Sequence, residues 1–141
     1  MKSKREKLMK ELYIEATVDN LSEVLGFVDE QLEAADCAMK VQMQIDLAVE
    51  EIFVNIANYA YGEDTGDAEI TVENKGGEIA ISFIDSGTPY NPLEKDDPDI
   101  TLSAEERQIG GLGIFLVKKN MDSVSYEYKD GKNIFTMTKV I

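Results

Sequence analysis

The fold is decided by one stretch of the sequence, Ile45-Asp46-Leu47-Ala48-Val49-Glu50-Glu51-Ile52-Phe53-Val54-Asn55-Ile56-Ala57-Asn58-Tyr59-Ala60-Tyr61. Apolar side chains recur in it at intervals of three and four residues, which is typical of a helix with one buried face. The apolar stripe consists of Ile45, Ala48, Val49, Ile52, Phe53, Ile56 and Ala60. We expect this helix to begin near Ala38 or Met39 and to end at Gly62, because glycine favours the backbone conformation found just past a helix end.

A polar strip runs beside the apolar stripe. Glu51, Asn55 and Asn58 follow one another at i, i+4 and i+7, so one edge of the helix carries a carboxylate and two carboxamides. Asparagine is a mediocre helix former because its side chain competes for backbone hydrogen bonds. The strip is therefore either the solvated edge of an amphipathic helix or part of a functional site, and this stretch alone does not separate the two.

The length of the chain fits one domain. A chain of 141 residues can bury an ordinary core and leaves no room for a second domain of useful size. No apolar run approaches the roughly 18 residues that a membrane span needs, and no apolar signal-peptide segment follows the first residues. We therefore expect a single cytoplasmic domain that does not enter a membrane.

The composition excludes several kinds of chemistry. Cys37 is the only cysteine and the chain has no histidine, which rules out disulfides within the chain, zinc sites of the usual Cys/His kind and histidine-based triads. Any catalytic base must then be a carboxylate, a lysine or a tyrosine. The 14 basic and 28 acidic residues give a net charge of −14, which would repel nucleic acid and anionic membranes. We expect neither as a direct partner.

The charge is distributed unevenly along the chain. Residues 1–10 carry a net charge of +4, whereas residues 11–141 carry −18. We expect residues 1–10 to form a basic, flexible arm in front of a single domain that comprises residues 11–141. The alternative is a functional arm that contacts the acidic body of a neighbouring subunit.

The remaining elements follow from the hydrophobic pattern. Alternating apolar and polar residues predict strands over residues 11–18, 67–74, 78–85, 122–130 and 132–141. Helical periodicity predicts further helices over residues 21–34 and within residues 110–121. Hairpins between consecutive strands make the sheet mostly antiparallel. The predicted fold is an α+β two-layer sandwich, in which helices cover one face of a mixed, mostly antiparallel sheet.

A long connection separates the third predicted strand from the last predicted helix. Residues 88–109 are polar, acidic and interrupted by Pro89, Pro92 and Pro98, and the segment exceeds the dozen or so residues usual for a connection in a compact domain. Loops of this kind are lids or disordered segments. We expect this lid to be poorly ordered without a ligand and to close when one binds.

Two short patterns outside the central helix could carry chemistry. Gly110-Gly111-Leu112-Gly113 opens a helix with free N–H groups and the positive end of the helix dipole, which suits phosphate groups; the alternative is a helix start that needs glycine for a close turn. Asp85-Ser86-Gly87 follows a strand and could present a carboxylate to the exocyclic amino group of a flat ring. It is as easily a turn.

The polar strip of the central helix could supply a metal ligand and a base. Asn55 offers a carbonyl oxygen of the kind that Mg²⁺ takes, and this cation needs few protein ligands when it is also bound to substrate phosphates. Glu51 lies one turn earlier, where its carboxylate could remove the proton of a nucleophile.

Taken in this order, the motifs resemble a known fold family. Glu51-x-x-x-Asn55, Asp85-x-Gly87, the lid and Gly110-Gly111-Leu112-Gly113 resemble the N, G1 and G2 boxes of the Bergerat-type ATP-binding fold, which gyrase, heat-shock chaperone and histidine-kinase ATPase domains share. The compact length and the segments 85–92 and 110–117 resemble, within that superfamily, the anti-sigma-factor serine/threonine kinases that regulate partner switching in bacteria. The resemblance runs from about Glu11 to the end of the chain.

The resemblance implies a site for ATP or ADP with Mg²⁺. Glu51 matches the general base and Asn55 the Mg²⁺ ligand, with Asn58 on the same nucleotide-facing strip. Asp85 matches the residue that reads the adenine amino group, and Gly87 lies by the base. The turn Gly110-Gly111-Leu112-Gly113 matches the segment that contacts the phosphates.

Two positions depart from the pattern of this family. Arg107 stands one residue further from the glycine turn than the arginine that family members often use for phosphate contact. Asn133 stands near the start of the last strand, where the family often has a threonine that supports the adenine. An asparagine can serve through either end of its amide.

The resemblance also implies partners. It implies a kinase that phosphorylates a small anti-anti-sigma protein, with a sigma factor as a further candidate partner, and a homodimer formed through the first strand and helix. One alternative is a nucleotide-binding module that sequesters a sigma factor without kinase activity. Another is a regulator that has the fold but binds no nucleotide.

Overall fold

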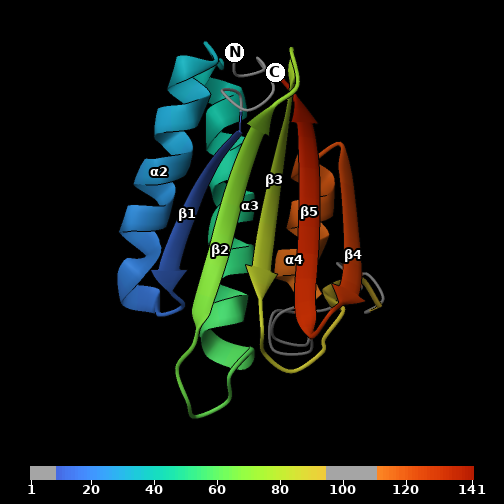
Figure 1. Ribbon diagram of the computed structural model, residues 1–141. Coiled ribbons are helices and arrows are strands. Elements are labelled where there is room, and N and C mark those ends of the chain that lie inside the picture. The colour runs from blue at the N-terminus through green and yellow to red at the C-terminus, as the bar shows by residue number, and fades with distance from the viewer. Residues whose placement is uncertain (1–8, 95–110) are drawn as a thin grey trace.

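The structure, a computed structural model, describes residues 9–94 and 111–141 of the chain. Within these ranges five strands form one sheet and three α-helices pack against it (Figure 1). The strands are β1 (Met9–Glu15), β2 (Asp67–Asn74), β3 (Glu78–Asp85), β4 (Ser123–Lys129) and β5 (Lys132–Val140). The helices are α2 (Leu21–Ala34), α3 (Met39–Tyr59) and α4 (Gly111–Asn120), with short 3-10 turns η1 (Val18–Asn20) and η2 (Pro92–Glu94).

The sheet has the strand order β1-β2-β3-β5-β4, and every neighbouring pair is antiparallel. The three helices cover one face of it, with α3 between α2 and α4 (Figure 1). This arrangement confirms the predicted α+β two-layer sandwich. The sequence predicts a mixed, mostly antiparallel sheet, whereas the described sheet is antiparallel throughout. The reason is that the long connections from β1 to β2 and from β3 to β5 reverse the chain direction, as the two hairpins do. None of the helices in the described ranges has the length and apolar character needed to cross a membrane.

Element boundaries differ from the predicted ones by a few residues. β1 begins at Met9 and ends at Glu15. It ends there because Glu15 pairs with Asp67, which is the first residue of β2. Lys10 therefore lies in the sheet. α3 ends slightly earlier than predicted, and Gly62 follows it with a φ of 62°, the left-handed conformation that its residue type favours.

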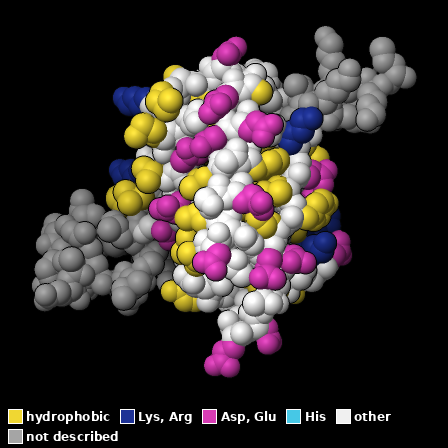
Figure 2. All heavy atoms as spheres, turned by 90° about the vertical axis from the view of Figure 1, so that its left-hand side faces the viewer, with side chains coloured by type: hydrophobic (Ala, Val, Ile, Leu, Met, Phe, Trp, Pro, Cys, Tyr) yellow, Lys and Arg dark blue, Asp and Glu magenta, His cyan; other side chains and the backbone are white. Residues whose placement is uncertain are grey.

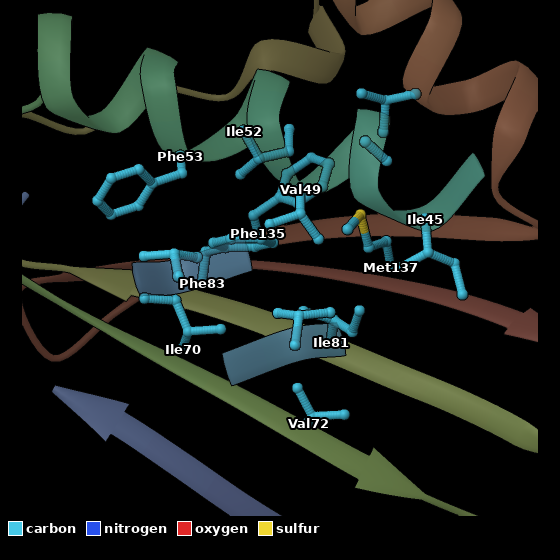
Figure 3. Close-up of a cluster of buried hydrophobic side chains, with 14 of the residues drawn as sticks. Ile45, Val49, Ile52, Phe53, Ile70, Val72, Ile81, Phe83, Phe135 and Met137 are labelled. Atoms are coloured by element: carbon cyan, nitrogen blue, oxygen red, sulfur yellow. The ribbon is translucent and has the colours of Figure 1, made fainter. Parts of the chain in front are cut away.

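The core lies between α3 and the middle of the sheet, as Figure 3 shows. Phe53 of α3 and Phe83 of β3 are fully buried in it. The buried part of the predicted stripe consists of Ile45, Ala48, Val49, Ile52, Phe53 and Ile56. Complete burial of a large apolar side chain contributes about 1.5–3 kcal/mol, so α3 is held against the sheet along most of its length. The core thereby fixes the position of the polar strip on the edge of α3.

Two carboxyl groups meet where α2 packs against α3. Asp29 of α2 and Asp46 of α3 each have a buried Oδ1 atom without a hydrogen-bond partner among the described residues. Desolvation, followed by the nearby carboxyl group of Asp29, raises the pKa of Asp46 from 3.8 to about 7. A raised pKa in the folded state means that folding favours the protonated carboxyl. The corresponding stabilisation is complete below about pH 4 and is lost as the pH rises through 7.

We expect Asp46→Asn to raise the melting temperature at pH 8 by about 3 °C, because it removes about 1 kcal/mol of unfavourable charge from a partly exposed site. At pH 5 the wild-type carboxyl is already protonated, so the difference should nearly vanish. Thermal denaturation at the two pH values measures the effect, with Asp64→Asn in an exposed loop as the charge-matched control. Equal gains at both pH values would show that Asp46 does not titrate in this range.

Candidate functional site

A cavity of about 450 Å³ lies between the C-terminal half of α3, the end of β3 and the start of β5. Its lining consists of Ile52, Asn55, Ile56, Tyr59, Ala60, Phe83, Asp85, Thr88, Pro89, Tyr90, Pro92, Ile114, Tyr126, Asn133 and Phe135. The walls are mostly apolar and carry a few polar groups, which is the usual make-up of a site for a small organic molecule. The volume falls within the roughly 300–1,000 Å³ typical of ligand pockets.

Asp85, the last residue of β3, supplies a buried carboxylate to this cavity. Its Oδ1 atom accepts hydrogen bonds from the Gly87 N–H and from the Asn133 side chain, both at 2.9 Å. No described residue forms a hydrogen bond with Oδ2. One carboxylate oxygen is thus held by the protein, and the other remains able to accept a hydrogen bond from a ligand, as an exocyclic amino group would provide.

Gly87 is constrained by the end of α3. A Cβ atom at position 87 would overlap the carbonyl oxygen of Ala60, and the next residue, Thr88, donates its N–H to that same oxygen at 2.8 Å. The loop after β3 therefore lies directly against α3, and only glycine allows this approach. The sequence predicts a glycine that lets a flat ring approach the backbone. In the structure, Ala60 at the end of α3 approaches Gly87 closely, and the approach of a flat ring stays a prediction.

Glu51 and Asn55 of the polar strip are hydrogen-bonded to each other. Asn55 Nδ2 donates to Glu51 Oε2 at 2.9 Å, which orients the Asn55 amide and leaves its carbonyl oxygen for another partner. Asn55 lines the cavity and Glu51 does not. Burial raises the pKa of the Glu51 carboxyl above its usual value; the Asn55 hydrogen bond opposes this change and the charge of Glu50 adds to it. A raised pKa suits a group that accepts and releases a proton near neutral pH.

Gly113 brings the first turn of α4 against Glu51. A Cβ atom at position 113 would overlap the Glu51 carboxyl group. The carboxylate therefore lies near the N-terminal end of α4, where the helix dipole favours negative charge. A side chain at position 113 would therefore displace the Glu51 carboxyl group from its observed place.

The other predicted site residues are placed as follows. Asn58 is exposed and does not line the cavity, because it lies further round α3 than Asn55. Gly111 and Leu112 are in the first turn of α4. Arg107 and Gly110 lie outside the described residues, as does most of the lid predicted over residues 88–109, of which only residues 88–94 are described.

The sequence analysis missed the aromatic residues of the cavity. Tyr59, Tyr90 and Tyr126 line it; Tyr90 belongs to the segment 85–92 of the resemblance but has no predicted role there, and the other two lie outside its motifs. Tyr59 directly follows the polar strip, so the helical pattern could have suggested it. Tyr126 lies on β4 opposite Phe135 of β5, and this placement depends on a strand register that the sequence does not define.

Comparison with known proteins supports the resemblance. Residues 14–139 match a family model described as the histidine kinase-like ATPase domain. Serine/threonine-protein kinase BtrW from Bordetella bronchiseptica is 27% identical over 100 residues, which cover 70% of this chain and 70% of the relative. Serine-protein kinase RsbW from Listeria monocytogenes is 36% identical over 104 residues. That match covers 69% of this chain and 64% of the relative, just under two thirds of its length.

Solved structures share the fold. The structure of the RsbU and RsbW domains of Rv1364c from Mycobacterium tuberculosis matches with a TM-score of 0.68 and 16% identity, over 94% of this chain and 32% of that chain. The SiaB–SiaC complex from Pseudomonas aeruginosa matches with a TM-score of 0.60 and 17% identity, over 96% of this chain and 92% of that chain. At these identities the likeness establishes the fold, in agreement with the predicted two-layer architecture.

Proposed function

Because this chain belongs to the histidine kinase-like ATPase domain family, we propose that it binds ATP and ADP in the cavity beside α3. The observation that carries this proposal is the buried carboxylate of Asp85, which retains one oxygen for a donor inside a mostly apolar cavity. A planar adenine ring matches the apolar walls, and its exocyclic amino group would donate to Asp85. Gly87 and Asn133 hold the carboxylate in place for this contact.

The residues around Asn55 fit Mg²⁺ bound together with a nucleotide. No cluster of three or more acidic, cysteine or histidine side chains that could hold a metal occurs among the described residues. A cation held by one carbonyl oxygen, water and substrate phosphates needs no such cluster, which is how Mg²⁺ commonly binds. The carbonyl oxygen of Asn55 is the group assigned here, because Nδ2 is engaged by Glu51. When bound, Mg²⁺ would neutralise phosphate charge.

We assign the phosphates to the N-terminal end of α4. The helix begins at Gly111, and its free N–H groups and positive dipole end are suited to an anion. The family resemblance adds Gly110, Leu112 and Gly113 to this turn and Arg107 to the preceding segment. Because Glu51 lies at the same helix end, the proposed base and the proposed phosphate site are close together.

The proposed reaction is transfer of the γ-phosphoryl group to a serine or threonine of a small anti-anti-sigma protein. The names of the relatives BtrW and RsbW as serine kinases support it, and a structural neighbour was solved as the SiaB–SiaC complex. Glu51 would accept the proton of the attacking hydroxyl, while positioning and charge stabilisation supply the rest of the catalysis. A sigma factor is a second proposed partner.

We further propose a homodimer that uses the face formed by β1 and α2. β1 is an edge strand, and an exposed edge favours pairing with another chain. Figure 2 shows apolar side chains between acidic ones on this side of the molecule. Tyr13 of β1 is 69% exposed. Light scattering at high protein concentration should give the dimer mass, and a monomer mass would contradict the proposal.

Titration calorimetry with ADP and Mg²⁺ tests the proposed binding function. We expect saturable heat with one site per chain and a rise in melting temperature, because a ligand that binds only the folded state stabilises it. Chelation of Mg²⁺ should weaken the binding. A protein that shows neither heat nor a thermal shift with ADP or ATP would be a regulator that shares only the fold.

A further inference from the structure

Asn133 is the centre of a hydrogen-bond network beneath the cavity. The residue is buried at the start of β5, and its Nδ2 donates to Asp85 Oδ1 at 2.9 Å and to the carbonyl of Thr88 at 3.0 Å. Its Oδ1 accepts the Tyr90 N–H at 3.1 Å and the hydroxyl of Tyr126. Both ends of the amide are therefore satisfied, which is the normal condition of a buried carboxamide.

The orientation of this amide decides what Asp85 can do. With Nδ2 toward Asp85, which lines the cavity, the amide donates to Oδ1 and leaves Oδ2 able to accept from a ligand. A rotation of 180° would place the carbonyl oxygen of Asn133 against the carboxylate, so that two acceptors would repel each other. The same rotation would turn Nδ2 toward the Tyr90 N–H, so that two donors would also face each other.

Tyr126 is the side chain that donates to the Asn133 oxygen, and it favours this orientation together with the Tyr90 N–H and the Thr88 carbonyl. Its ring is half-buried opposite Phe135 on the neighbouring strand and lines the cavity. The other donor to Asn133 Oδ1 is the backbone N–H of Tyr90, in the loop after β3. The Tyr126 hydroxyl has one proton, and it donates this proton to Asn133 Oδ1. Burial raises the pKa of Tyr126, so the hydroxyl stays protonated at ordinary pH.

We propose that Tyr126 is a positioning residue that helps the site select the nucleobase. By holding the Asn133 amide with Nδ2 toward Asp85, Tyr126 makes the site prefer a nucleobase with an exocyclic amino group. The inference rests on the proposed binding of adenine nucleotides in this cavity. A threonine at position 133 would need no such support, because a hydroxyl can rotate to donate to Asp85 by itself. An asparagine amide has two orientations, so at this position it needs a neighbour such as the Tyr126 hydroxyl to favour one of them.

Calorimetry with ADP and IDP, each with Mg²⁺, tests this inference, because IDP carries a carbonyl where ADP carries the amino group. We expect Tyr126→Phe to weaken ADP binding about fivefold, the value of one lost hydrogen bond, and to leave IDP binding unchanged or improved. The preference for ADP over IDP should therefore fall about fivefold or more. Tyr128→Phe, which removes an exposed hydroxyl from the same strand, should leave the preference as it is in the wild type.

A double variant separates positioning from a general structural effect. In the background of Asn133→Thr, we expect Tyr126→Phe to change neither ADP affinity nor the ADP/IDP preference. Equal losses for both nucleotides, an unchanged preference in Tyr126→Phe, or the same loss in the Asn133→Thr background would each overturn the inference. If the wild type bound ADP normally, these results would leave the proposed function intact. A wild type that bound neither nucleotide would overturn both.

Discussion

Glu51→Gln is expected to lower phosphoryl transfer at least about 100-fold while leaving ADP affinity within about twofold of the wild type. Removal of a general base typically costs a factor of about 10²–10⁴, and glutamine cannot take up the hydroxyl proton. Its amide oxygen can still accept the Asn55 hydrogen bond that Glu51 accepts at 2.9 Å. The proposed nucleotide site uses Asn55 rather than Glu51, so nucleotide binding should survive the substitution.

A transfer assay with labelled ATP and the anti-anti-sigma protein recovered from the native cell measures this effect. Glu50→Gln is the matched control, since Glu50 is the exposed neighbour of Glu51 and the variant loses the same charge. Unchanged transfer in Glu51→Gln would exclude Glu51 as the base. ATP binding without transfer in the wild type would instead favour a module that sequesters a sigma factor.

The pH dependence of the same assay provides a second measure of Glu51. Burial raises the pKa of this carboxyl, and a general base acts in its deprotonated form. The transfer rate should therefore fall as the pH drops through the pKa of Glu51, which lies above that of an ordinary glutamate. The Glu51→Gln variant should lack this limb of the profile.

Asp85→Asn is expected to lower ADP affinity about 100-fold and to reverse the preference between ADP and IDP. The Gly87 N–H and the Asn133 side chain both donate to Oδ1 of Asp85, so a carboxamide at this position must keep its oxygen there. Its NH₂ group then faces the cavity, where the adenine amino group would meet a second donor. The loss of a charge-assisted hydrogen bond together with an unsatisfied buried donor costs about 3 kcal/mol.

Calorimetry with both nucleotides measures the reversal, because the carbonyl of hypoxanthine would accept from the new NH₂ group. Asp64→Asn, in an exposed loop, controls for the lost charge. A variant that bound both nucleotides as the wild type does would show that Asp85 does not contact the base. A variant that bound neither ADP nor IDP, but melted like the wild type, would show that the nucleobase contacts Asp85 but not with the proposed hydrogen-bond geometry.

The sequence by itself determined the local geometry of the central helix and the class of the fold. The 3.6-residue period of α3 fixes both its buried face and the one-turn spacing of Glu51 and Asn55, and the structure shows those two side chains hydrogen-bonded. Alternation and turn residues likewise defined the strands, to within a few residues. Such features depend only on neighbours in sequence, so they can be predicted from it.

Only the tertiary structure decided which distant residues meet. Asp85 and Asn133 are paired across β3 and β5, and Tyr126 reaches Asn133 through the register of β4 with β5. Gly87 lies against the backbone of Ala60 at the end of α3, and Gly113 lies against the Glu51 carboxyl group. Register and helix packing arise from the burial of the whole core, and many pairings satisfy the same alternation. The central helix could therefore be derived from the sequence, whereas the network beneath the cavity required the folded chain.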